Sequence, residues 1–520
     1  MQFKRLALFI CLGSGLPAAA QDVSERPLSA IDWLSQTIGT PDLSEIAQPQ
    51  INEPPVADTA TPPEISVTPL DSSSPDAIGL LSSAVTGLPQ NLWSQSDEAT
   101  LSTLVRASRA ETLPAVQELM VTLMLAEAAP PLNASATGVM FLARVDKLLD
   151  LGALEPAQAL IEAAGPDTPE VFRRWFDVSL LTGTESVACD LMREKPALSP
   201  TYPARIFCLA RGQDWTAAAL TLNTARALGD VTDEEDALLS RFLDPELFEG
   251  MGPLPPPSRP SPLVFRMREA IGEGLTTSGL PRAFAHADLR SSIGWRSQIE
   301  AAERLARHGA ISEVTLVSIY NQHTPAASGG VWDRAAAIQQ FDAAIRASDA
   351  EEVARTLPAA WSAMQAARTE VAFARHYTDD LSGLALDGDV AALAFRIGLL
   401  APSYETVALA QTELSAEEMV WQAVARGDVT GIDANDIPGE AVLAAFAQMP
   451  TLDSISAPLA TLIAEEKLGE VLLRAISLFN QGVDGDFGAL TDALRVLRLV
   501  GMEDIARRAA LQFLLLDRPS

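Results

Sequence analysis

Three stretches of twelve residues share one pattern that decides the fold: LDLGALEPAQAL at 149–160, LLTGTESVACDL at 180–191 and LARGQDWTAAAL at 209–220. The shared residues are Leu149, Gly152, Ala157 and Leu160, then Leu180, Gly183, Ala188 and Leu191, then Leu209, Gly212, Ala217 and Leu220. The glycines are 31 and 29 residues apart, and self-similarity at such a period is typical of stacked structural repeats.

Glycine and alanine have separate physical roles in this pattern. A glycine can end a helix in the left-handed conformation without the steric penalty that a Cβ atom brings. The alanine then starts the facing helix where two backbones come close, and the leucines fill the space between the helices. The pattern therefore predicts a series of helical hairpins.

With these residues in place, segment 141–229 resembles the tetratricopeptide family of helical hairpins at superfamily level. The turn glycine, close-packing alanine and terminal proline of that family are matched by Gly152, Ala157 and Pro169, and by Gly183, Ala188 and Pro200. The chain departs from the family where a small residue is usual before the turn, at Val145, Phe176 and Arg205, and has Gly229 where a third proline is expected. The resemblance implies a superhelix whose concave face binds peptides or protein segments.

The rest of the chain also favours helices separated by Gly, Pro or Asp. We expect one helical region at 97–243 and a second, with degenerate repeats, at 263–520. A proline-rich linker at 244–262 separates them, because proline lacks an N–H and clashes with the preceding helical turn. Looser echoes of the pattern occur at Gly309, Gly388, Leu468-Gly469 and, with Ala506 and Ala509, at Gly501. The predicted fold class is all-α, a tetratricopeptide-like α-solenoid in two regions.

The first twenty residues have the three parts of a signal peptide. A basic start at Lys4 and Arg5 is followed by an apolar run from Leu6 to Leu12, and Ala18-x-Ala20 supplies the small residues before cleavage. The run is too short to span a bilayer, which takes about 20 residues. We therefore expect cleavage near Ala20, a periplasmic or secreted protein of a Gram-negative bacterium, and no integral membrane segment.

Segment 21–96 is predicted to be mostly disordered. No Lys or Arg occurs between Pro27 and Val105, and proline recurs among Ser, Thr, Asp and Glu. Two islands interrupt it, and Ile78 to Trp93 is the weaker helix candidate of the two. In the stronger island Ile31, Leu34 and Ile38, with Trp33 among them, fall at helical spacing. These residues are a candidate docking helix.

The net charge of −31 bears on the choice of partner. Such a surface repels phosphate backbones, so we expect no nucleic-acid partner. A protein or peptide is the expected partner, and the excess of acidic residues mainly favours solubility.

Candidate catalytic patterns are weak. Ser328, in Ala326-Ala327-Ser328-Gly329-Gly330, comes near a nucleophile elbow, but an elbow requires a strand that runs directly into the turn. Glu185-Ser186 shows a faint similarity to lytic transglycosylases, which also carry helical superhelices. The four histidines have neither the spacing nor the paired cysteines of a zinc site, and we expect no cofactor, no metal and no catalytic residue.

Cys189 and Cys208 are the cysteines that remain once the signal peptide is removed. In the repeat alignment they fall on successive antiparallel helices, on either side of one connection. An oxidising compartment favours a disulfide between them, and two buried thiols are the alternative.

Two functions follow from these patterns. The first is a non-enzymatic scaffold or adaptor that binds protein segments through a helical-repeat surface, in an envelope or motility assembly. The alternative is a serine hydrolase or a relative of a cell-wall enzyme, with a transglycosylase-like superhelix that lacks the catalytic domain.

Overall fold

The computed structural model describes residues 74–516, and this range forms helices and no β-strand. The first helices are η1 (Pro75–Ala77), α2 (Ser83–Thr86), α3 (Glu98–Ala107), α4 (Pro114–Leu125), α5 (Val139–Asp150), α6 (Leu154–Ala164), α7 (Pro169–Thr182), α8 (Glu185–Glu194), η2 (Pro196–Leu198), α9 (Tyr202–Arg211), α10 (Trp215–Leu228), α11 (Asp233–Leu243) and η3 (Pro245–Phe248). The predicted all-α fold class is confirmed for the described residues.

The second half continues in the same way. Its helices are α12 (Pro262–Ala270), η4 (Arg282–Leu289), α13 (Trp295–Ala306), α14 (Glu313–Tyr320), α15 (Val331–Arg346), α16 (Ala350–Ala367), α17 (Glu370–Ser382), α18 (Gly388–Gly398), α19 (Tyr404–Ala410), α20 (Ala416–Arg426), α21 (Ile437–Phe446), η5 (Leu452–Ser454), α22 (Ala457–Ala464), α23 (Leu468–Val483), α24 (Phe487–Leu499) and α25 (Glu503–Leu515). None of the helices in the described range has the length and hydropathy that a membrane crossing requires.

Local sequence signals set many of these boundaries. The side chain of Thr168 accepts the backbone N–H of Val171 at the start of α7, and proline follows at the first helical position. Thr232 and Ser415 each form a capping box with a glutamate three residues later. These contacts satisfy backbone donors that a helix N-terminus leaves free.

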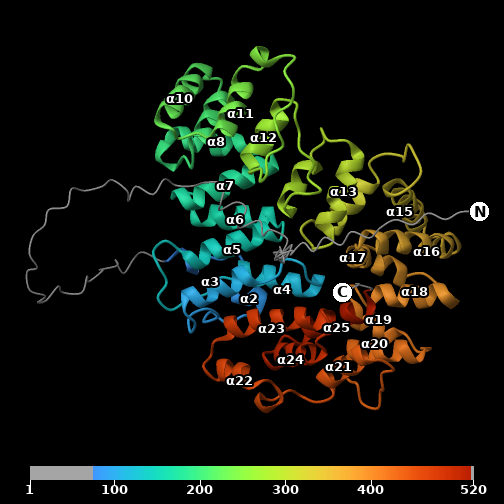
Figure 1. Cartoon of the computed structure of the whole chain (residues 1–520). Helices are drawn as coiled ribbons and strands as arrows, with labels where there is room; N and C mark the ends of the chain where they lie inside the picture. Colours follow the sequence, from blue (N-terminus) through green and yellow to red (C-terminus); the bar gives the residue numbers. More distant parts are fainter. Residues whose placement is uncertain (1–73, 517–520) are drawn as a thin grey trace, which may run out of the picture.

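Neighbouring helices along the chain pack against one another, and the two halves also meet. Pairs such as α7 and α8, α8 and α9, and α9 and α10 are in contact. After the proline-rich segment, α12 packs on α7 and η4 packs on α5 and α7. Figure 1 shows the path, which rises from α3 to α10, crosses to α13 and returns through α18 to α24.

The ends of the described chain pack on each other. Helices α3 and α4 contact α23, and α4 contacts α25 (Figure 1). The Ala115 N–H donates to Gln512 Oε1 at 2.8 Å, and Arg508 Nη1 lies 2.9 Å from Glu118 Oε2. The fold is therefore closed by contacts between residues nearly 400 positions apart.

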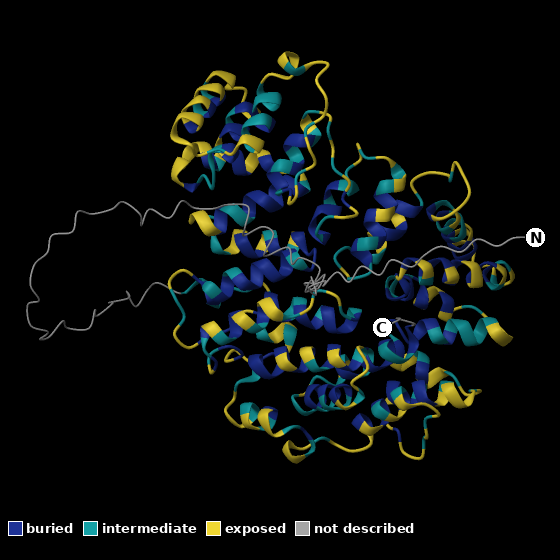
Figure 2. Ribbon diagram, viewed as in Figure 1, coloured by how far each residue is buried: buried dark blue, intermediate teal, exposed yellow. Residues whose placement is uncertain are grey.

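One hydrophobic core cluster runs through almost the whole described chain, from Leu88 to Leu516 (Figure 2). Helix is interrupted between η3 and α12, as the prolines predict, but the core is not. The described parts of the two predicted regions, 97–243 and 263–516, thus share a core instead of standing apart on a linker.

The expected disordered segment 21–96 needs correction at its C-terminal end. Residues 74–96 are packed, and Trp93 has no exposed surface. The Gly469 N–H donates to Leu92 O at 3.0 Å, and a Cβ on Gly469 would lie 2.4 Å from the Trp93 ring. This segment packs with few apolar residues because Gly469 of α23 has no side chain, so the Trp93 indole can approach the α23 backbone closely. The signal peptide and the candidate docking helix at Ile31, Trp33, Leu34 and Ile38 lie outside the described residues.

Candidate functional site

The first two repeats have the predicted arrangement. Gly152 and Gly183 have φ values of +77° and +81°, in the left-handed region that favours glycine. The residue after each donates its N–H five positions back, to Leu148 O and Ser179 O. Ala157 and Ala188 are fully buried, and Leu149, Leu160 and Leu180 are also in the core, with Leu191 half-buried.

The third repeat is shifted by one residue from the predicted register. Gly212 has φ −78°, and Gln213 takes the left-handed conformation at +66°. Asp214 then donates to Leu209 O, as Ala153 and Thr184 do in the earlier repeats. Ala218, instead of Ala217, is fully buried, while Leu220 is 67% exposed. The prediction placed the turn at Gly212, whereas in the structure the turn residue is Gln213.

The later echoes of the pattern differ in their outcome. Gly501 has φ +86°, and Ala506 and Ala509 are fully buried as the pattern expects. Gly309 also adopts a left-handed turn, and Gly388 is the first residue of α18. Gly469 lies inside α23, and the preceding turn uses Glu466 at φ +58°.

The structure joins Cys189 of α8 and Cys208 of α9 in a disulfide, with Cα atoms 5.0 Å apart. Both residues are buried between packed helices. The bridge therefore links the second and third repeats.

Thiol counting tests this bridge in the protein itself. Denatured, unreduced mature protein should show no free thiol, and reduction should lower the free energy of unfolding by about 3 kcal/mol, because the loop closed by the bridge is then released in the unfolded chain. Two free thiols before reduction would contradict the assignment.

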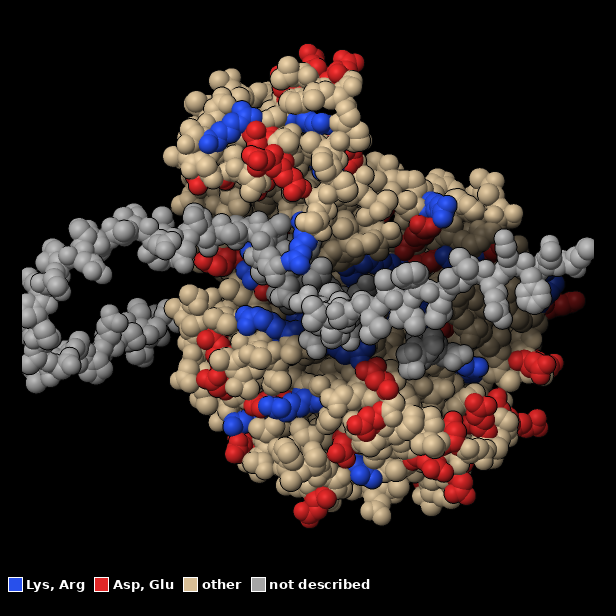
Figure 3. Space-filling model, viewed as in Figure 1, with Lys and Arg blue, Asp and Glu red and all other residues tan. Residues whose placement is uncertain are grey.

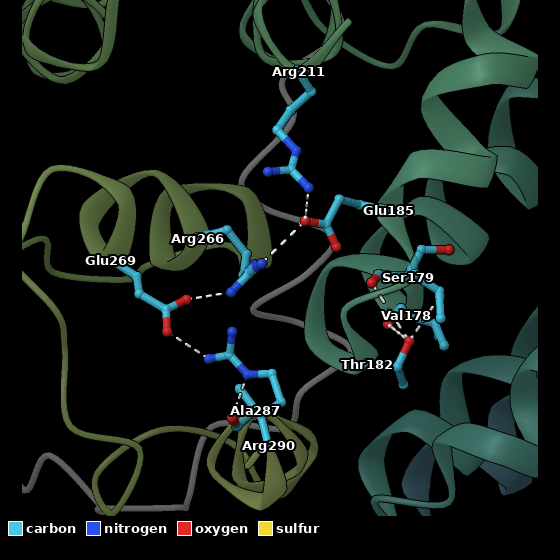
Figure 4. Close-up of polar contacts among 10 residues, drawn as sticks. Val178, Ser179, Thr182, Glu185, Arg211, Arg266, Glu269, Ala287 and Arg290 are labelled. Carbon is cyan, nitrogen blue, oxygen red and sulfur yellow. Dashed lines mark hydrogen bonds and ion pairs between the residues drawn. The ribbon is translucent and has the colours of Figure 1, made fainter. Parts of the chain in front are cut away.

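A partly buried ion-pair network connects these repeats to the second half of the chain. Glu185, at the start of α8, accepts Arg266 of α12 at 3.0 Å and Arg211 of α9 at 3.1 Å (Figure 4). Arg266 also pairs with Glu269, which accepts Arg290 at 2.6 Å. Glu185 is only 2% exposed, so its carboxylate holds helices together and does not open onto a cleft.

A pocket lies between α7, α9 and α12. We call it the α7/α9/α12 pocket, and its walls include Arg173, Phe176, Asp177, Ala204, Leu263 and Met267. The N-cap residues of two helices, Thr201 of α9 and Ser261 of α12, lie at its edge. Most of the lining is apolar, and Asp177 is a carboxyl group that is 8% exposed.

Burial raises the pKa of Asp177 to about 7, and the charge of nearby Asp146 acts in the same direction. Arg173 and Arg174 oppose the rise. Arg174 is engaged with Asp146 through two bonds of 2.5 and 2.7 Å.

Asp177 should make stability depend on pH. Its folded pKa lies above the unfolded value, so the folded state holds more protons and loses stability as pH rises from about 4 to 7. Asp177→Asn should therefore be more stable than the natural chain at pH 8, on the order of 4 kcal/mol, and equal to it near pH 4. Thermal melts at the two pH values measure this, with Asp190→Asn on exposed surface as the control. A gain of equal size at both pH values would contradict the assignment.

The other candidates from the sequence are Ser328 and the histidines, and the structure places Ser328 in a setting that differs from a nucleophile elbow. Ser328 lies in the loop between α14 and α15, so in the described chain a helix, not a strand, precedes it. The His323 ring packs against Trp295, with centroids 5.4 Å apart. Across residues 74–516 there is no group of three or more His, Cys, Asp or Glu side chains arranged to hold a metal.

Acidic and basic side chains are interspersed over the face seen in Figure 3, between larger areas of other residues. No protein-family model, curated protein or solved structure matches the chain. Over the described residues the protein is all-helical, with helical hairpins and a pocket between three of its helices.

Proposed function

We propose that the protein is an exported, non-enzymatic scaffold that binds protein segments through a tetratricopeptide-like helical surface. The observation that carries the proposal is the turn that recurs at Gly152, Gly183 and Gln213. Each turn is followed five residues later by a fully buried alanine. Repeats of this kind build extended surfaces from neighbouring units, and proteins use such surfaces to bind other chains.

The compartment is supported by two independent features. The first twenty residues have the order of a signal peptide, with Ala18-x-Ala20 before the expected cleavage. The Cys189–Cys208 bridge requires an oxidising environment to persist. A periplasmic or secreted scaffold in an envelope or motility assembly agrees with both.

Capture with the mature chain, residues 21–520, tests the function. We expect periplasmic extract of the native organism to yield the same protein partners in repeated captures, and a fluorophosphonate probe to leave Ser328 unlabelled. Labelling that disappears in Ser328→Ala would instead establish a serine hydrolase and contradict the proposal.

A further inference from the structure

The α7/α9/α12 pocket combines apolar walls with two polar groups of opposite charge. Phe176 and Met267 supply apolar surface, and Leu263 adds to it. Arg173 and Asp177 lie one helical turn apart on α7 and both line the pocket. A ligand here would contact both apolar surface and this pair of opposite charges.

The other polar groups of the lining already have partners. Thr201 Oγ1 accepts the Ala204 N–H at 3.2 Å, and Ser261 Oγ accepts the Val264 N–H at 3.1 Å. Glu235 accepts the Thr232 N–H at 2.8 Å. One oxygen atom of each of these three side chains is thus engaged at a helix N-terminus.

Asp177 and Arg173 differ from these groups. Among residues 74–516, no side chain or backbone group forms a hydrogen bond with the Asp177 carboxyl, although it is more than nine-tenths buried. The buried Nε of Arg173 is likewise without an acceptor among the described residues. A ligand N–H that pairs with the Asp177 carboxyl would supply a hydrogen bond that no described residue makes, and this bond would favour binding.

The chemistry of the ligand follows from this pair. A cationic group would pair with Asp177 but would be repelled by Arg173. An anionic group would pair with Arg173 but would be repelled by ionised Asp177. A carboxamide is uncharged and offers an N–H donor for Asp177 and a carbonyl acceptor for Arg173. We infer that the pocket binds a glutamine side chain of a partner protein segment, with its methylene groups against the apolar walls. This inference rests on the proposed function.

The titration of Asp177 is compatible with this ligand. With a pKa raised to about 7 by burial, the carboxyl exists in both forms near neutral pH. Both forms accept a hydrogen bond from an amide N–H. The other charged groups nearby are Arg174 and Asp146, which bind each other, and Glu235, which caps α11.

Binding of small probes to the full mature chain tests the inference. Saturation-transfer NMR should show N-acetyl-glutamine methylamide bound about tenfold more tightly than N-acetyl-methionine methylamide, which has a similar length and no amide at its end. Nα-acetyl-lysine methylamide should bind no better than the methionine probe. Equal binding of the glutamine and methionine probes, or tighter binding of the lysine probe, would overturn the inference.

Two variants locate the binding. Asp177→Leu should remove the preference for glutamine, and Val264→Phe, at the pocket wall, should weaken all probes. Asp190→Leu on exposed surface should change nothing, and thermal melting verifies that each variant is folded. Glutamine preference that survives in folded Asp177→Leu would place the site elsewhere.

The same variants separate this inference from the proposed function. If Asp177→Leu captures the same protein partners as the natural chain and neither protein prefers the glutamine probe, the pocket assignment fails and the scaffold proposal stands. If the glutamine probe binds but no partner is captured, the scaffold proposal fails.

Discussion

Trp93→Ala is expected to lower the free energy of unfolding by about 4 kcal/mol, because it empties a fully buried indole site. The indole packs on Gly469 of α23 and so fastens the start of the described chain to its end. Urea denaturation followed by circular dichroism measures the loss.

Trp215→Ala is the matched control for this substitution. Trp215 begins α10 and is 49% exposed, so its removal should cost well under the Trp93 value. Equal losses in the two variants would mean that Trp93 is not packed as described.

Arg144→Met should also cost about 4 kcal/mol. The Arg144 guanidinium has no exposed surface and donates to four backbone carbonyls: Met124 at 2.7 Å, Ile78 at 2.8 Å, Ala126 at 3.1 Å and Asp76 at 3.2 Å. Methionine fills similar space but leaves these acceptors unpaired.

A local readout accompanies this loss. Because residues 76–78 would lose their donor, protease cleavage near them should speed up in Arg144→Met. Arg296→Met is the control, since Arg296 is 68% exposed and pairs with Glu300 within one helix. That variant should change stability by less than about 0.5 kcal/mol. No difference between the two variants would contradict the buried role of Arg144.

The helical character of the chain was predictable because its signals are local. Gly152 and Gly183 end helices, prolines stop α-helix between η3 and α12, and Thr168 caps α7. Each depends on residues within one turn of the position concerned. Hence the hairpin pattern in the first two repeats could be seen in the sequence.

Features that depend on distant contacts could not be predicted in the same way. Nothing near Trp93 in the sequence indicates that Gly469 leaves room for its ring. The predicted register of the third repeat was wrong by one residue. The left-handed conformation that glycine usually takes is adopted there by Gln213, and the neighbouring Gly212 does not adopt it.

The pocket was also outside the reach of the sequence patterns. Asp177 and Arg173 occur on one turn of α7, a spacing that usually indicates an exposed ion pair. The pocket that encloses the Asp177 side chain also takes residues of α9 and α12, which are distant in the sequence. The pattern that could have drawn attention to it is a pair of opposite charges on a helix whose neighbours are aromatic.

Crosslinking followed by mass spectrometry in the native organism can show whether the helical repeats bind a segment of another protein. A short crosslinker is applied to cells that produce the natural chain at its normal level, and crosslinked peptides are mapped onto residues 74–516. We expect recurrent links from helices α7 to α12 to one defined segment of another exported protein. Links confined to this chain, or scattered over many abundant proteins without a common segment, would contradict a scaffold that binds protein segments.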